Sequence, residues 1–195
     1  MHIDLSLPLT QKTFDDLAAT SSRTHYALEL FGHVGTHLDL MGKPWPQEYF
    51  ARSGRIFDVR HVRGRDIDAG DLTVDAIRSG EFVFLRTGVL EEHAYASKDY
   101  IHAPVRLSWN LLETLLQKKV AMIGVDCAGV RQPEEHKKAD LLCAEAGAFV
   151  VENVYNLDAL CETAGAAAFM VRTFPLRLED ATGLPCRIVA EFADA

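Results

Sequence analysis

The residues best suited to chemistry lie in the stretch 33–39, where two imidazoles and one carboxylate fall close together: His33, His37 and Asp39. Side chains alternate along an extended chain, so His37 and Asp39 share one face about 7 Å apart. His33 and His37 would be about 13 Å apart in a straight strand, too far for one ion about 2 Å from each ligand. Gly35 tolerates positive φ and permits the bend that brings them together. The stretch therefore predicts three ligands for one divalent ion, or a metal-free histidine pair hydrogen-bonded to Asp39.

A second candidate pair, His136 and Glu152, lies in the C-terminal half. A helix from His136 to Ala146 rises about 15 Å, and the strand after Gly147 returns about 16 Å to Glu152. Both side chains are therefore expected at the same end of this unit. A glutamate that ends the apolar run 149–151 is costly to bury without a cation or hydrogen-bond partners. Taken alone, His136 is equally compatible with a solvated helix position.

Two classes of element must position these residues, and their mixture predicts an α/β protein with one domain over residues 1–195. Runs such as Phe82-Val83-Phe84-Leu85 are typical of strands buried on both faces. The connection 89–104 shows no clear period, and a connection of this length predicts a lid or a subunit contact. Strands are predicted at 2–5, 55–62, 81–86, 120–126, 149–154, 166–173 and 187–192, and helices at 72–79, 108–118, 134–146, 156–162 and, as a short helix or turn, 11–20.

Composition restricts the possible partners. The chain has 195 residues, 48% hydrophobic and 25% charged, with a formal net charge of −8. Its acidic residues are spread along the chain and no basic stripe is present, which argues against nucleic acid and anionic membranes. The four cysteines form no C-x-x-C pair and indicate reduced thiols. With no signal-peptide pattern at the N-terminus and no apolar run long enough to span a membrane, we expect a cytoplasmic protein.

The stretch 33–39 resembles the H-x-G-T-H-x-D-x-P-x-H signature of the cyclase family of metal-dependent hydrolases, which includes kynurenine formamidase and isatin hydrolase. The segment 136–157 resembles that family's distal metal-site motif, and further similar segments extend the resemblance over nearly the whole chain. The resemblance implies a compact single-domain β/β/α fold with a mixed sheet and flanking helices, assembled as a homodimer or homotetramer. It also implies a divalent metal. Histidine and carboxylate ligands suit zinc, and also manganese or iron in an open site, and we expect zinc or manganese.

The signature departs from the family pattern at its end, where Lys43 stands in place of the last histidine. In two-metal members that histidine would hold a second ion, together with the residues that match His136 and Glu152. An ammonium group has only donors and is a poor ligand. We therefore expect one ion, with the Lys43 ammonium pairing with Asp39 or Glu152 in the vacant space, or else pointing to solvent.

The resemblance implies hydrolysis of a C–N amide bond in a small N-formyl, N-acyl or cyclic amide, as in an arylformamidase. His33, His37 and Asp39 would bind the ion, Glu152 or His136 would move the proton, and Lys43 would supply a fixed charge. Thr36 would support the ligands through a hydrogen bond. Two alternatives remain: a non-catalytic metal- or ligand-binding member, and a cyclase or dehydratase that uses the same metal. Candidate substrate contacts are Trp45, Phe31 and Arg86.

Overall fold

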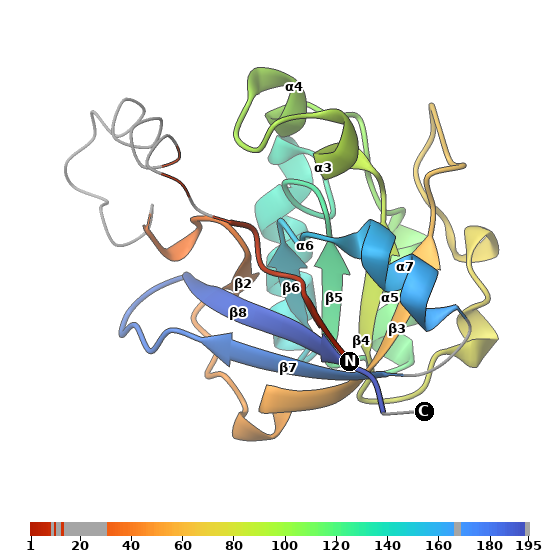
Figure 1. The fold of residues 1–195 in the computed structure, drawn as a ribbon. Coiled ribbons are helices and arrows are strands. Elements are labelled where there is room, and N and C mark those ends of the chain that lie inside the picture. Colours follow the sequence, from red (N-terminus) through yellow and green to blue (C-terminus); the bar gives the residue numbers. More distant parts are fainter. Residues whose placement is uncertain (9, 11–12, 14–30, 166–168, 194–195) are drawn as a thin grey trace.

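The computed structural model describes residues 1–8, 10, 13, 31–165 and 169–193, so the short helix or turn predicted at 11–20 lies outside the described residues except for Thr13. The apolar runs become the centre of the sheet. Strands β4 (Phe82–Arg86), β5 (Met122–Val125) and β6 (Phe149–Glu152) are fully buried. They are parallel to one another and to β3 (Ala51–Asp58), with their carboxyl ends toward the top of Figure 1. Strands covered on both faces become continuous apolar runs, as predicted.

Antiparallel strands close this sheet on itself. β2 (His37–Asp39) lies between β6 and β8 (Gly183–Glu191), and β7 (Phe169–Pro175) lies between β3 and β8. Seven strands thereby form a closed, barrel-like ring in the order β8-β2-β6-β5-β4-β3-β7. β1 (His2–Asp4) pairs with the far half of β8, on the edge that β2 leaves open. The predicted α/β fold with a mixed sheet and flanking helices is confirmed.

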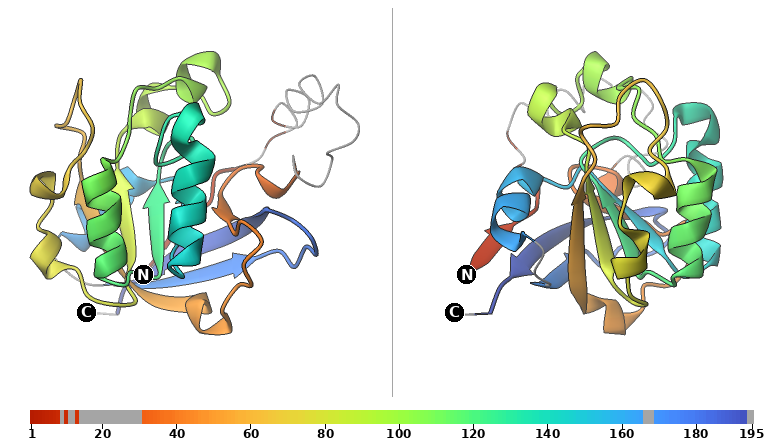
Figure 2. Two further views of the ribbon diagram at one scale, coloured as in Figure 1. Left: turned by 180° about the vertical axis from the view of Figure 1, so that it is seen from behind. Right: turned by 90° about the vertical axis from the view of Figure 1, so that its right-hand side faces the viewer.

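Helices lie on both sides of the parallel strands (Figure 2). α5 (Trp109–Gln117), in the region of the helix predicted at 108–118, begins where the Ser108 side chain accepts a hydrogen bond from the Leu111 amide and so caps the helix. It lies beside α6 (Pro133–Glu145), and α7 (Leu157–Ala164) lies on the opposite side of the sheet. The connection 89–104 contains two short helices. The remaining short helices are α3 (Val89–Glu92), α4 (Lys98–Ile101), and the 3₁₀ turns η1 (Gln47–Phe50), η2 (Ala69–Asp71) and η3 (Val74–Ala76).

The helix predicted at 72–79 is wrong, because this segment forms only the turn η3 and extended chain. Asp71 precedes this segment and is a residue type that commonly caps helices, but it closes the preceding turn instead: its side chain accepts hydrogen bonds from the Asp68 amide and from Arg65. The cap is therefore engaged before the segment begins. Thr73 and Val74 are also β-branched, which lowers helix propensity.

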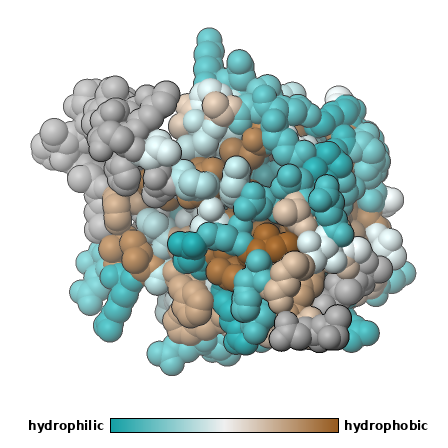
Figure 3. Space-filling view, viewed as in Figure 1, coloured by the Kyte–Doolittle hydropathy of each residue, from teal (hydrophilic) through white to brown (hydrophobic). Residues whose placement is uncertain are grey.

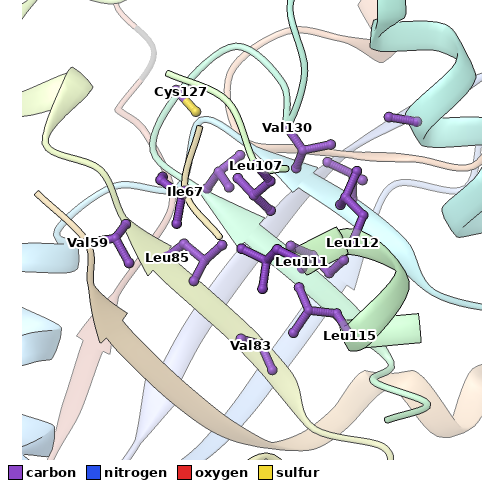
Figure 4. Packing of buried hydrophobic residues seen from close by; sticks show 14 of the residues in the cluster. Val59, Ile67, Val83, Leu85, Leu107, Leu111, Leu112, Leu115, Cys127 and Val130 are labelled. Atoms are coloured by element: carbon purple, nitrogen blue, oxygen red, sulfur yellow. The ribbon is translucent and has the colours of Figure 1, made fainter. Parts of the chain in front are cut away.

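Two apolar cores lie on opposite faces of the sheet. The first lies between the sheet and α5, where Val83 and Leu85 meet Leu111 and Leu115 (Figure 4). The second fills the inside of the ring and extends to α7. There the rings of Phe82 and Phe84 stack 4.0 Å apart beside Gly124, where a Cβ would come within 2.7 Å of Phe84. Glycine on β5 is therefore required for this ring packing.

The face in Figure 3 is hydrophilic over its upper right part and carries a hydrophobic patch near its centre. Large exposed apolar side chains include Phe50, Phe174 and Leu176, which lie near the β7–β8 turn. Among the described residues, no helix is long and apolar enough to cross a membrane.

Candidate metal centre

The centre is built on the pairing of β2 with β6. His37 lies directly opposite Glu152 in the antiparallel register, and Asp39 follows His37 by two residues on the same face. His37 Nε2 lies 3.6 Å from Asp39 Oδ1 and 3.6 Å from Glu152 Oε2. All three side chains are at least nine-tenths buried. Sheet register therefore brings together an imidazole and two carboxylates from segments more than a hundred residues apart in the chain.

The bend predicted at Gly35 is present, with φ of +63°. It returns His33 to the cluster, where its Nδ1 lies 3.1 Å from Asp39 Oδ1 and its ring meets that of His37 edge to face at 4.8 Å. His33 Nε2 lies 3.0 Å from the Thr182 hydroxyl. One ligand atom from each of His33, His37 and Asp39 lies within 4.8 Å of the others, the convergence that the sequence predicts.

Helix α6 brings its first turns to the same place. His136 Nε2 lies 3.2 Å from Glu152 Oε1, so the matched lengths of α6 and β6 do place both side chains at one end. His136 Nε2 also lies 3.1 Å from Oδ2 of Asp140, one helical turn later and nearly fully buried. Asp39, His136 and Asp140 form a second convergent set of donors that shares Asp39 with the first. Asp140 was not predicted; its i, i+4 spacing from His136 was the signal available in the sequence.

Gly129 makes room for this contact and was also not predicted. Its φ is +96°, and a Cβ there would lie 2.5 Å from His136 Nδ1 and 3.1 Å from Glu152 Oε1. Real Cβ contacts are not this close, so a side chain at this position must displace the imidazole or the carboxylate. The glycine therefore sets the approach of α6 to β6.

A buried hydrogen-bond network fixes the His37 ring. Its Nδ1 lies 2.9 Å from the Gly35 carbonyl, which also accepts from Asn153 Nδ2 at 2.7 Å. The Tyr100 hydroxyl donates to Asn153 Oδ1. An Nδ1–H bonded to a carbonyl leaves Nε2 as the free ring nitrogen, the arrangement typical of metal-bound histidine. Thr36 takes part as expected of a supporting residue, although its hydroxyl donates to the Asn153 carbonyl, 2.7 Å away, rather than to a ligand side chain.

Several buried polar atoms of the cluster find no hydrogen-bond partner among the residues that the structure describes: His37 Nε2, Asp39 Oδ2, Asp140 Oδ1 and Glu152 Oε1. Buried polar atoms normally find partners, and buried charges are normally paired or bind metals. Imidazole and carboxylate donors suit zinc and also manganese or iron. The donor types, their convergence and these free lone pairs all fit a divalent cation held among these side chains.

Burial and the mutual attraction of imidazoles and carboxylates set the pKa values of the cluster. Burial would lower the pKa of His37, but the carboxylates of Asp39 and Glu152 outweigh it and raise this pKa to about 9. The carboxylates of Asp140 and Glu152, 3.1 and 3.2 Å from its Nε2, raise the pKa of His136 to about 11. Burial raises the pKa of Asp140 to about 6. Burial opposes ionisation of Asp39 as well, yet His37 and His33 hold its pKa well below the usual range. Protons on His37 and His136 thus balance the carboxylates of the cluster.

Other predicted site residues lie away from this cluster. The Lys43 side chain is exposed and, within the described part of the chain, pairs with neither Asp39 nor Glu152, so it follows the solvent-exposed alternative. Arg86 is buried and its guanidinium pairs with Glu91 at 2.6 Å, so its role as a substrate contact stays a prediction. Phe31 is 42% exposed.

A cavity of about 890 Å³ lies beside the centre rather than at it. Lys43 and Trp45 line it with Leu40, Leu184 and Thr182. Leu184 lies opposite Leu38 on β2, and both belong to the core inside the ring, the face opposite His37 and Asp39. The Thr182 hydroxyl links this cavity to the cluster, through its 3.0 Å contact with His33 Nε2. We place the chemistry at the cluster, because the convergent ligand atoms and unpartnered lone pairs are there.

Comparison with known families identifies the chain. Residues 3–132, about two thirds of its length, match the family model described as "Putative cyclase". The protein belongs to the cyclase family. The matched residues include the three predicted metal ligands: His33 in the bend before β2, and His37 and Asp39 on β2. No curated protein matches the sequence.

Solved structures agree with this cyclase fold. The chain is similar to a potential metal-dependent hydrolase with cyclase activity, with a TM-score of 0.74, 18% identity, and coverage of 100% of this chain and 99% of the other. For a predicted metal-dependent hydrolase from Bacillus stearothermophilus, the TM-score is 0.73 and the identity is 18%, with 97% of each chain covered. For an isatin hydrolase bound to the product analogue thioisatinate, the TM-score is 0.69 and the identity is 21%. The match covers 84% of this chain and 73% of the other. At these identities the likeness establishes the fold.

Proposed function

We propose that this cyclase-family protein is a metal-dependent hydrolase that cleaves the C–N amide bond of a small N-formyl, N-acyl or cyclic amide. The observation that carries the proposal is the convergence of His33, His37 and Asp39 beside unpartnered carboxylate oxygens in a buried cluster. The structures of metal-dependent hydrolases and of isatin hydrolase with the same fold support it.

In this proposal His33, His37 and Asp39 hold one divalent ion, zinc or manganese. A bound ion of this kind lowers the pKa of water and polarises a carbonyl. The Gly35 carbonyl keeps His37 oriented by accepting from Nδ1. Burial on the α6 side of β2 restricts bulk water around the ligands and strengthens each electrostatic interaction.

The two residues from α6 and β6 divide the proton transfers. Glu152 Oε1 has no hydrogen bond and is available to accept a proton from attacking water. His136 lies 3.2 Å from this oxygen, so the proton can pass along the pair to the leaving nitrogen. Water thereby adds its oxygen to the carbonyl carbon, the C–N bond breaks, and the amine leaves with the proton. Asp140 holds the His136 ring in place.

Turnover of a panel of aryl formamides and cyclic amides, with zinc or manganese added, tests the proposal. We expect amine and carboxylate products that incorporate oxygen from labelled solvent water. A product without solvent oxygen would favour the cyclase or dehydratase alternative, and metal binding without turnover of any amide would favour a non-catalytic role. Metal analysis of the loaded protein tests the single ion, because two ions per chain would contradict it.

A further inference from the structure

A second polar cavity lies at the opposite end of the parallel strands from the metal centre. It has a volume of about 520 Å³ and is formed by the start of β3, the turn 78–81 before β4, and Met170 of β7. The first residues of β3 and β4 lie at the lower end of the sheet in Figure 1. The metal centre is instead built where β6 ends, so the two sites are separated along the strands.

The cavity gathers arginines that have no acidic partner. Every other arginine that the structure describes has a carboxylate oxygen within 4.0 Å of a side-chain nitrogen. Arg52 and Arg78 are the two exceptions among the described residues, and both line this cavity. In a chain with a net charge of −8, two unpaired guanidinium groups in one hollow are unexpected.

Local contacts hold the Arg52 side chain in place but leave its buried Nε–H without a hydrogen-bond acceptor among the described residues. Its guanidinium carbon lies 4.5 Å from the centre of the Tyr49 ring, a cation–π contact. Its Nε is buried and has no hydrogen-bond partner within the described part of the chain. A Cβ at Gly80 would lie 3.6 Å from Arg52 Nη1, so this guanidinium lies over the turn that carries Arg78.

The one carboxylate in the wall, Glu81, is already engaged. Its two oxygens accept from Arg55 Nε and Nη2 at 2.8 and 2.7 Å, and one of them also accepts from the Arg78 amide at 3.0 Å. Burial raises the pKa of Glu81, but the hydrogen bonds from Arg55 and from the Arg78 amide outweigh burial, and the pKa is lowered overall. Glu81 is therefore ionised and paired with Arg55. The Arg78 guanidinium acts on Glu81 only through space, so the guanidinium donors of Arg52 and Arg78 remain for a ligand.

We propose that this cavity, defined by Arg52, Arg78 and the turn 78–81, binds a small anion through a phosphate group. A phosphate monoester carries a charge of about −1.5 to −2 at pH 7 and matches two guanidinium charges, whereas a carboxylate carries one. The planar guanidinium fork also suits phosphate oxygens. The Ser53 and Ser79 side chains in the same wall supply further hydroxyl groups. This site is independent of the amide chemistry.

Calorimetric titration of the metal-loaded protein with inorganic phosphate, at constant ionic strength in chloride, tests the site. The double variant Arg52→Gln/Arg78→Gln is expected to lose at least about 10-fold in phosphate affinity, since it loses two charge-assisted contacts. The matched control Arg63→Gln/Arg177→Gln removes two charges from exposed ion pairs elsewhere and should retain the affinity within about 2-fold. Circular dichroism confirms that the variants are folded.

Two further arms make the result decisive. Phenyl phosphate should bind more tightly than phosphate if the natural ligand is an organic phosphomonoester, and equally if it is free phosphate. Acetate should bind far more weakly than either. Phosphate binding that persists undiminished in the Arg52/Arg78 variant would lie elsewhere, such as at the metal centre, and would overturn the proposal. Equal affinity for acetate and phosphate in the unaltered protein would overturn it as well.

Discussion

Two buried carboxylates lie at neighbouring strand ends of this sheet and have opposite environments. Asp126 follows β5, and Glu152 ends the adjacent strand β6. Asp126 accepts from the Thr87 amide at 2.7 Å, the Thr87 hydroxyl at 2.6 Å and the Gly88 amide at 2.8 Å. Glu152 Oε1 accepts no hydrogen bond, although imidazoles surround the side chain.

The difference separates a structural carboxylate from a functional one. The donors around Asp126 belong to the turn that leads into α3, so this carboxylate holds a loop in place, and both of its oxygens accept hydrogen bonds from that loop. Burial raises the pKa of Asp126, and the same donors act against the rise. Around Glu152 the polar partners are other potential ligands, which satisfy one another only through shared protons. Burial alone therefore does not mark a site, but burial with unused lone pairs does.

The largest expected effect is at the open cluster. His37→Ala should lower metal affinity by more than about 100-fold, the upper end of losses seen for groups that merely support ligands, and should abolish turnover. Calorimetric titration with zinc and manganese measures the affinity. The Asp126→Asn variant is the matched control at the closed site and should bind metal as the unaltered protein does. Equal metal affinity in His37→Ala would place the ion elsewhere.

At the closed site the effect should appear in stability instead. Asp126→Ala leaves two buried amides and a hydroxyl without an acceptor, at about 1–3 kcal/mol for each donor that water cannot reach. We expect a loss of about 3 kcal/mol in the free energy of unfolding, measured by urea titration of the metal-free protein. The metal affinity of the folded variant should stay within about 3-fold. A stable Asp126→Ala variant with impaired metal binding would reverse the roles assigned to these two carboxylates.

The contrast between these carboxylates also shows what the sequence could predict. The ligand spacing at 33–39, the Gly35 bend and the meeting of His136 with Glu152 follow from chain geometry and are present. Asp140 and Gly129 were missed because their importance depends on how α6 docks on β6, which no local pattern specifies. Arg86 and Lys43 were assigned to the site by residue type, yet the partner of Arg86 and the exposure of Lys43 are set by tertiary packing. The dimer or tetramer, the metal type and the cytoplasmic location stay predictions.

A smaller effect is expected from the approach of α6 to the cluster. Gly129→Ala places a Cβ 2.5 Å from His136 Nδ1 and forces an alanine into positive φ. We expect a stability loss of about 1–2 kcal/mol and a reduction in turnover of about 10-fold, because a shift of about 1 Å in a catalytic group is costly. Gly147→Ala is the control: it also has positive φ, but nothing lies within 4 Å of its added Cβ. Equal losses of turnover in both variants would show that backbone strain, not displacement of His136, is responsible.

The smallest expected effect is a change in how the free energy of unfolding depends on pH, through His37 in the open cluster. In the metal-free protein the pKa of His37 is raised from 6.5 to about 9, so its contribution to stability is complete below pH 6.5 and is lost as the pH rises through about 9. Unfolding free energies of chelator-treated protein between pH 6.5 and 10 should therefore fall less steeply in His37→Gln than in the unaltered protein. Identical slopes in the two proteins would mean that the imidazole in the open cluster is not holding the proton that balances its carboxylates.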